Sequence, residues 1–543
     1  RLPALMIPSS IVTLDALPLS GNGKLDRKAL PAPSGVAAGQ PAQPPREGTE
    51  ARLAAIWSEL LNTGAIGRQT HFFEAGGHSL LAVALIGRIR QAFDLSLPLS
   101  ALVAHLDLMS QAALIDAERE KAAAAAPSQA PAQAAAQTGR IRALPAQKAI
   151  YKAIRLNPAD LSNNSFVALE FDAEPDLKQL RNLLQATLAR HEGLGARFAL
   201  DGGELFLQPA PRFLFRLEKR QSLGSLEEDL RDFIRPFSLE DGMNVRGRWL
   251  ADGERPVLLL DFSHACIDGS GLMRILEELA GEAPELAAGA SLAAYSDLFH
   301  GDGFAAMRQA HAAFWRERLQ GWAPAPQAGI QPQSRTCELA LDADSKARIA
   351  ALSARLKISM PEFFMAVFLG FKARLEQRRD QLASMIFHGR DQLEQQAVIA
   401  PLMAVLPVRF DWPEGGADAE TLRGVSAAVR QACRHYLFDA DEMAARHPDL
   451  PRQALSPSAF FGYFTRDGFT GRIAGMPCRQ RETPVIAGGQ AHWSLSCEIA
   501  EHDAGFDVRL EASSHPADDR GQPWDALFHS IVQGALDAGR QSN

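Results

Sequence analysis

A histidine and an aspartate lie four residues apart directly after an apolar run. Residues 257–262 read VLLLDF, and His264, Asp268 and Gly269 follow them. An imidazole held where a strand ends, near a glycine that permits a backbone turn, can take a proton from an amine or a hydroxyl near neutral pH. His264 is therefore a candidate general base. The same spacing also occurs in ordinary hydrogen-bonded His–Asp pairs, so both interpretations stay open at this point.

A serine follows two glycines in the segment Gly-Gly-His-Ser at 76–79. The glycines allow a tight turn that exposes the hydroxyl of Ser79, and the apolar spacing behind it predicts a helix beginning there. A helix N-terminus favours a phosphate attached at that point. A simple Ser N-cap is the alternative interpretation.

Two other chemistries are less well supported by the residue types. Cys266 is a possible nucleophile, but no His or Asn signature accompanies it, and its place between Ala265 and Ile267 is typical of a packing residue. A zinc site would need more ligands than His264 and Asp268 supply. We expect no metal.

The composition bounds the kind of protein that positions these residues. The chain has 543 residues, a net charge of −8, 46% hydrophobic and 22% charged residues, which predicts several folded units and excludes disorder as the dominant state. The absence of a basic stripe argues against nucleic acid as a ligand. No apolar run approaches the roughly 20 residues that a membrane span needs. Five scattered cysteines predict neither a disulfide framework nor zinc binding, and favour the cytoplasm.

Two Pro/Ala-rich stretches, 31–45 and 121–138, divide the chain and read as linkers, because neither can form a core. The second would have a reach of roughly 25 Å as a flexible coil. Between them, apolar residues at helical spacing predict one helix from Thr49 to about Gly64, a second after Gly77 and a third stretch from Asp107. This is a small helical bundle.

The remaining residues mix strand patterns with amphipathic helices. Strands are predicted at 166–171, 257–262 and 506–512, and helices at 177–189 and 363–375. An α/β architecture follows. We expect two subdomains, about 140–322 and 333–543, separated at the Pro-rich segment 324–332.

The segment FFEAGGHSL at 72–80 resembles the peptidyl carrier proteins of nonribosomal peptide synthetases, although Ala75 stands where the family usually has Leu. The resemblance covers 49–118. It implies a four-helix-bundle carrier domain in which Ser79 holds a covalent 4′-phosphopantetheine, attached by a phosphopantetheinyl transferase.

Residues 8–30, which include Gly21-Asn22-Gly23-Lys24, look like the extreme C-terminus of an adenylation domain. The resemblance implies that Lys24 corresponds to a lysine that contacts the acyl adenylate. About thirty residues cannot form an ATP pocket. We therefore expect a remnant at 1–32, a linker at 33–48, and no working adenylation site.

The region 140–543, after a linker at 119–139, resembles the condensation domains of the same synthetases, which share the fold of chloramphenicol acetyltransferase and carry the motif His-His-x3-Asp-Gly. Ser263 replaces the first histidine here. The other landmarks occur in order: Leu144-Pro145-Ala146-Gln147, Arg190 to Leu194, Phe314-Trp315, Gly389-Arg390 and Leu406-Pro407-Val408-Arg409. The resemblance implies that His264 deprotonates or positions the nucleophile, that Asp268 is structural and held by Arg390, and that the Gly269 amide helps bind the oxyanion.

Three departures from the family pattern bear on function. Gly195 replaces a usual Arg, Ala404-Val405 replaces a usual Asn-Thr, and the Ser263-His264 form is similar to terminal, chain-releasing condensation domains. We expect transfer of an acyl or peptidyl group from Ser79 to an amine or hydroxyl, as a chain-terminating condensation that forms an amide or an ester. The acceptor is a free molecule, a nucleophile in the peptide itself or a group on the carrier of another protein, and upstream synthetase modules are the expected partners.

Two alternatives remain. Epimerases share His-x3-Asp-Gly but have Glu-Gly-His-Gly-Arg where this chain has Ile386-Phe387-His388-Gly389-Arg390, so the acid for exchange at the α-carbon is missing. A catalytically silent docking module is the other alternative, motivated by Ser263 and Ala404.

Overall fold

The computed structural model describes two compact units, one within the first 130 residues and one comprising nearly all the rest. The described residues are 43–61, 66–72, 75, 85, 88–89, 92–93, 95, 97, 105, 107–124, 139–251, 255–282, 291–324, 335–390, 393–465, 468–483, 493–512 and 523–541. Ser79 and Lys24 lie outside them. None of the described helices combines the length and apolar character needed to cross a bilayer.

The small unit contains α1 (Thr49–Leu61) and α4 (Leu108–Ala124), whose buried side chains share one core. Trp57 packs edge-on against Phe72, with ring centroids 5.0 Å apart. Leu85, Ile89 and Phe93, which lie in the region after Gly77 where the second helix is predicted, are buried in this core.

Helix α4 extends further than the sequence pattern indicated. It runs to Ala124, into the stretch predicted to be a flexible linker. Alanine has the highest helix propensity of all residues, so a helix already formed from Leu108 can continue through Ala122 and Ala123 without an apolar face.

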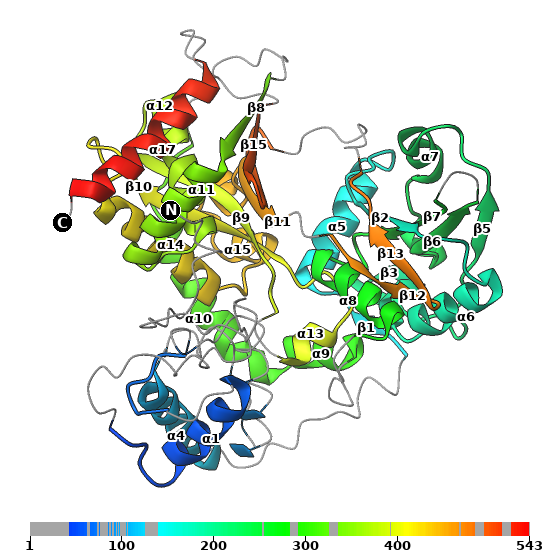
Figure 1. Ribbon diagram of the computed structural model, residues 1–543, viewed down its shortest axis with the longest axis horizontal. Helices are drawn as coiled ribbons and strands as arrows, with labels where there is room; N and C mark the ends of the chain where they lie inside the picture. The colour runs from blue at the N-terminus through cyan, green and yellow to red at the C-terminus, as the bar shows by residue number, and fades with distance from the viewer. Residues whose placement is uncertain are drawn as a thin grey trace, which may run out of the picture. The chain divides into compact units, whose positions relative to one another are not determined.

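The large unit contains two six-stranded sheets, which confirms the α/β expectation (Figure 1). The first has the order β12-β13-β2-β7-β6-β5. Its strands are β2 (Asn164–Phe171), β5 (Leu217–Arg220), β6 (Val245–Leu250), β7 (Val257–Ser263), β12 (Thr470–Ile473) and β13 (Met476–Gln480). The predicted strands at 166–171 and 257–262 are the two central ones.

Helices cover both faces of this first sheet. Leu258, Leu260 and Phe262 of β7 share a core with one group of helices, while Val257 and Leu259 pack against α7 (Leu226–Phe233) on the other face. The helices and short helical turns of this half are α5 (Pro145–Leu156), α6 (Leu177–Leu188), η3 (Glu192–Gly195), α7 (Leu226–Phe233), η4 (Leu239–Asp241), α8 (Gly269–Ala280) and α9 (Leu292–His300). A small sheet of β1 (Ile141–Arg142), β4 (Glu204–Gln208) and β3 (Arg197–Asp201) adjoins them.

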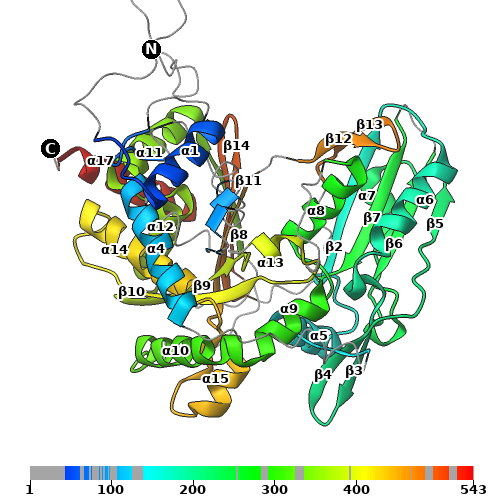
Figure 2. The same cartoon turned by 90° about the horizontal axis from the view of Figure 1, so that it is seen from below.

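The second sheet has the order β10-β9-β11-β14-β15-β8. Its strands are β8 (Arg335–Asp342), β9 (Asp380–Phe387), β10 (Ala404–Asp411), β11 (Ala459–Thr465), β14 (Leu495–His502) and β15 (Gly505–Ala512). The helices of this half are α10 (Asp302–Leu319), α11 (Ala343–Leu356), α12 (Met360–Glu376), α13 (Leu393–Ala397), α14 (Ala419–Arg434), α15 (Ala440–Arg446), α16 (Arg452–Leu455) and α17 (Trp524–Gln541). Figure 2 shows α11, α12 and α14 on one side of this sheet.

The two halves are not separated as cleanly as a boundary at 324–332 implies. Strands β12 and β13, from the C-terminal half, join the first sheet, where Cys478 of β13 pairs with Phe171 of β2. In the other direction, Trp315 and Leu319 of α10 belong to the core of the second sheet. Because α10 already packs in the second core, the chain enters that half before the Pro-rich segment, and pairing between distant strands decides which sheet each strand joins.

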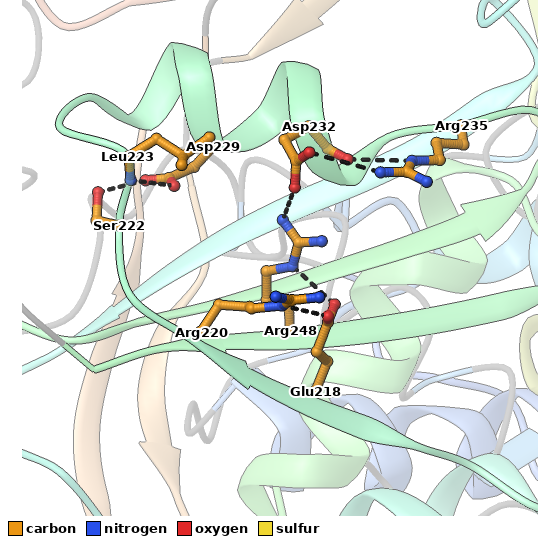
Figure 3. Close-up of polar contacts among 8 residues, drawn as sticks. All are labelled: Glu218, Arg220, Ser222, Leu223, Asp229, Asp232, Arg235 and Arg248. Atoms are coloured by element: carbon orange, nitrogen blue, oxygen red, sulfur yellow. Dashed lines mark hydrogen bonds and ion pairs between the residues drawn. The ribbon is translucent and has the colours of Figure 1, made fainter.

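A charged cluster fastens the edge of the first sheet (Figure 3). Arg248 of β6 is 6% exposed and donates to Glu218 on the neighbouring edge strand, 3.0 Å away, and to Asp232 on α7, 2.6 Å away. Arg220 also bonds Glu218, and Arg235 lies beside Asp232. The hydrogen bond from Arg248, followed by its charge, lowers the pKa of Asp232. Arg248 therefore joins three elements at one point.

We expect Arg248→Met to lower the free energy of unfolding by about 1–3 kcal/mol, because the variant loses charge-assisted bonds to both carboxylates. The measurement is the urea midpoint of the first unfolding transition. Arg255→Met is the matched control, since Arg255 pairs with Glu170 but its side chain is 46% exposed, and exposed pairs contribute less than about 1 kcal/mol. Equal losses in the two variants would contradict this account.

Candidate active site

His264 is the first residue after β7, whose seven residues are all buried. Its backbone N–H donates to the Asn163 carbonyl, 2.8 Å away, and its Nδ1 lies 2.7 Å from the Ile267 carbonyl oxygen. A carbonyl only accepts, so Nδ1 carries the proton. The lone pair is then on Nε2, and the side chain is only partly buried. The ring is oriented as a general base requires.

The turn that holds His264 is fixed by a residue from the first family landmark. Gln147 is fully buried, accepts from the Leu144 N–H at 3.0 Å and donates to the Ala265 carbonyl at 3.1 Å. One side chain thus connects two segments, since Gln147 and Ala265 are 118 residues apart in the chain.

A second support comes from Asn244, which is also fully buried. Its backbone carbonyl accepts from the Ser263 N–H at 2.9 Å. Its side-chain amide donates to the backbone carbonyls of Ala196 at 2.8 Å and Gly193 at 3.3 Å. The landmark at 190–194 therefore lies behind the end of β7.

Asp268 does not pair with His264. It is the N-cap of α8, and its Oδ1 accepts from the Gly271 N–H and from Arg390 Nη2, each at 2.8 Å. Its Oδ2 accepts from the Leu402 N–H at 3.0 Å. The ion pair expected between Asp268 and Arg390 is present. This carboxylate orients backbone and helix rather than the imidazole.

Arg390 is 5% exposed and holds a whole loop through its guanidinium. It donates to the carbonyls of Gln395 at 2.6 Å, Val398 at 2.7 Å and Ala400 at 2.9 Å. The neighbouring Gly389 has φ +65°, and a Cβ there would lie 1.9 Å from the Leu402 carbonyl oxygen. Only glycine permits this approach.

Gly269 begins α8 and is exposed. A Cβ at this position would meet no described atom within 4 Å. The first N–H groups of a helix have no intrahelical partner and point out of the helix end. Gly269 therefore leaves room beside its Cα for a substrate group at this helix end.

The far end of α8 is held by a cluster of charges. Glu278 accepts from Arg190 at 2.7 Å, from Arg274 at 3.1 Å and lies 3.0 Å from His191 Nε2. Burial by itself raises the pKa of this carboxyl, but the bonds and charge of His191, with those of the two arginines, outweigh it and hold the pKa at about 2. Both ends of α8 are therefore anchored through ionic contacts.

The residues that depart from the family pattern have different surroundings. A Cβ on Gly195 would lie 2.7 Å from the Phe213 ring, so a larger residue there requires the ring to move. Ser263 is fully buried, and its hydroxyl has no hydrogen-bond partner among the described residues. Val405 is 38% exposed.

Cys266 is fully buried, and burial raises the pKa of its thiol well above the ordinary range. A thiol in this state is a poor nucleophile. Within the described ranges, no three His, Cys, Asp or Glu side chains gather in a way that could hold a metal ion.

The sequence matches two protein families. Residues 137–514 match the condensation domain family, and residues 51–115 match the phosphopantetheine attachment site family. The first match covers more than half of the chain, so the chain belongs to the condensation domain family, and it also contains a carrier domain of the kind that bears covalent 4′-phosphopantetheine. Ser79 lies within the second match, and its hydroxyl is the group that a phosphodiester linkage needs.

The chain is similar to parts of antibiotic synthetases. It is 28% identical over 468 residues to bacitracin synthase 3 of Bacillus licheniformis, covering 82% of this chain and 7% of that protein. It is 36% identical over 284 residues to tyrocidine synthase 2 of Brevibacillus parabrevis, covering 52% of this chain and 8% of that protein. The chain thus spans less than a tenth of these relatives.

Solved structures show the same fold. The X-domain from teicoplanin biosynthesis has a TM-score of 0.60 and 20% identity, covering 74% of this chain and 95% of that one. The first condensation domain of the calcium-dependent antibiotic synthetase has a TM-score of 0.56 and 18% identity, covering 74% and 96%.

The sequence patterns did not identify several residues that shape the site. Leu402 and Ala400 contribute a backbone N–H and a backbone carbonyl. Because nearly every residue has these groups, the residue type does not reveal which of them bind Asp268 and Arg390. Glu278 is different: it lies four residues after Arg274, a spacing that places the two side chains together on a helix. That spacing could have indicated the cluster.

We expect Glu278→Gln to flatten the pH dependence of stability between about pH 4.5 and pH 2. The folded pKa lies below the ordinary 4.5, so the charged carboxylate stabilises the fold above pH 4.5, and this stabilisation is lost as the pH falls through the folded value. The variant should lose up to about 3 kcal/mol at pH 7. Urea titrations at several pH values measure both effects. An acid limb as steep in Glu278→Gln as in the parent chain would refute the assignment.

Proposed function

We propose that this chain is a carrier and condensation unit that transfers an acyl or peptidyl group from Ser79 to an amine or hydroxyl. The single observation that carries the proposal is the orientation of His264, whose Nδ1 donates to the Ile267 carbonyl so that Nε2 can accept a proton. The similarity to parts of nonribosomal synthetases supports the same reaction class.

The reaction balances with one base. A nucleophile N–H or O–H approaches the acyl carbonyl, a C–N or C–O bond forms, the C–S bond breaks, and His264 Nε2 takes the nucleophile's proton and passes it to the departing sulfur. Gly269, at the start of α8, offers its N–H to the carbonyl oxygen as negative charge develops. Asp268 and Arg390 keep this helix end in place.

The acyl group reaches the site by tethering. The 4′-phosphopantetheine arm supplies the thiol that holds the acyl group as a thioester. The stretch 125–138 between the described parts contains fourteen residues, which can span at most about 50 Å. Such a tether replaces a bimolecular encounter by a high effective concentration. We infer that Ser79 of the same chain serves His264.

We further propose that the product leaves the carrier, as in chain release, instead of passing to the next module. The support is the Ser263-His264 form of the motif, which resembles that of terminal condensation domains. Ser263 is buried in β7 and has no bond to the imidazole, so the serine leaves the geometry of His264 intact.

Epimerisation and silent docking make different demands on the site. An epimerase needs an acid at the position of Ile386, which is an apolar side chain, 47% exposed. A silent module needs no oriented base, whereas His264 is held at its backbone and at its ring. Both observations favour condensation.

The test loads Ser79 of the full chain with an acyl group and offers amines, alcohols and carrier-bound amino acids, with mass spectrometry of the products. We expect His264→Ala to lower turnover by about 10²- to 10⁴-fold, because proton transfer loses its base. His529→Ala, a histidine on α17, is the matched control and should retain turnover. Ser79→Ala should fail to load.

The products distinguish the three candidate functions. A new amide or ester supports condensation, and exchange of the α-hydrogen alone indicates epimerisation. If no acceptor yields product from the loaded wild-type chain, the proposal fails in favour of a docking module. Near-wild-type turnover by His264→Ala would remove the role given to that residue.

A further inference from the structure

The second sheet has one face that the helices do not fill. Leu406, Phe461, Cys497 and Leu510 point to the helices and form their core. Alternate residues point to the opposite face. In the middle of β9 this opposite face is closed, since Ser384 is fully buried.

The opposite face opens where β9 ends. Ile386 of β9 and Val405 of β10 are direct partners in the antiparallel register, and they are 47% and 38% exposed. Phe464 of β11 is 47% exposed and lies on the same face, because Phe460 pairs with Ser384 and Phe464 follows Phe460 by four residues. We call Ile386, Val405 and Phe464 the apolar patch.

The apolar patch has a charged border. On the same face, Gly462 of β11 pairs with Glu498 of β14, which pairs with Arg509 of β15 and then Glu338 of β8. Arg509 also forms an ion pair with Glu338. The face therefore changes from apolar to ionic between β11 and β14, and only its first three strands suit a hydrocarbon group.

The chain connects the apolar patch directly to the site of His264. Ile386 precedes Arg390 by four residues and Val405 follows Leu402 by three, so both lie within about 13 Å of chain from residues that bond Asp268. Phe464 lies at the end of β11, from which the chain continues into β12 and β13 of the first sheet. The patch thus lies near two segments of the C-terminal half that reach the first sheet. One is the connection between β9 and β10, whose residues 398–400 pack in the core of the first sheet, and the other is the β12–β13 pair.

From this geometry we propose that Ile386, Val405 and Phe464 form a subsite that binds the hydrocarbon part of the acyl group transferred by this chain. Covering exposed apolar side chains beside a reaction site with a hydrocarbon group removes apolar surface from water, which makes the binding free energy more favourable. Three adjacent strands span about 10 Å, which is the length of roughly three extended residues. That extent suits a long acyl or peptidyl chain better than a single-residue nucleophile.

This inference rests on the proposed function, and the experiment separates the two. The holo chain is loaded at Ser79 with acetyl or octanoyl groups and offered one fixed amine, and the ratio of turnover with octanoyl to turnover with acetyl is measured. We expect Ile386→Asn and Val405→Asn to lower this ratio about tenfold each, since a buried hydrocarbon contact discriminates by this order. Leu200→Asn, at another exposed leucine (62%) on β3, should leave the ratio unchanged.

A binding measurement gives a second readout that does not depend on turnover. Calorimetric titration of the unloaded chain with octanoyl-pantetheine amide and acetyl-pantetheine amide should show tighter binding of the octanoyl compound, and the difference should shrink in the two patch variants. Thermal unfolding checks that the variants fold. We expect them to fold, because both substituted positions are exposed.

The possible outcomes are distinct. A wild-type chain that makes no product refutes the proposed function. A productive chain whose ratio and binding difference persist in both patch variants refutes the subsite alone. The amine is also varied from methylamine to octylamine. If the patch variants change the relative turnover of these two amines and leave the octanoyl-to-acetyl ratio unchanged, the patch binds the nucleophile and the assignment to the acyl group is overturned.

Discussion

The site depends on one buried ion pair, between Asp268 at the start of α8 and Arg390 after β9. The partners are 122 residues apart in the chain and 5% or less exposed. Removing two charges from water costs several kcal/mol per ion, and the pair recovers this only with good geometry and further hydrogen bonds. Both partners have such bonds: Asp268 to the N–H groups of Gly271 and Leu402, and Arg390 to three carbonyls. Residues 395, 398, 400 and 402 are thereby tied through their backbones to the start of the helix that follows His264.

This arrangement divides the work differently from a Ser-His-Asp triad, in which a carboxylate orients the imidazole. Here a backbone carbonyl, from Ile267, sets the ring, while the carboxylate sets the backbone and the helix end. Rigidity of the turn then matters as much as the identity of the histidine. Gln147 and Asn244 supply that rigidity from two other segments.

Local pattern predicted what depends on local sequence. The alternation in β7, the turn at His264 and the start of α8 follow from residues that are adjacent in the chain, and the pairing of Arg390 with Asp268 followed from a family motif. The β12–β13 hairpin could not be predicted to join the first sheet, because its register with β2 is a contact over about three hundred residues, and such pairing leaves no periodic signal in either strand. The extension of α4 was missed because its local sequence is ambiguous: a run of alanines is typical of a linker and also of a helix.

The three departures from the family pattern are not equivalent once their surroundings are known. Gly195 packs against the ring of Phe213, which a larger side chain would displace, so it concerns packing behind the site. Ser263 is enclosed in the sheet and faces no solvent. Of these residues, only Val405 is exposed. It lies beside Ile386 and three residues after Leu402, whose N–H donates to Asp268. A change from a polar to an apolar side chain at an exposed position alters which molecules bind there, whereas the same change in a packed position alters stability. Of the three, the substitution at Val405 is therefore the one whose position allows it to change substrate choice without disturbing His264.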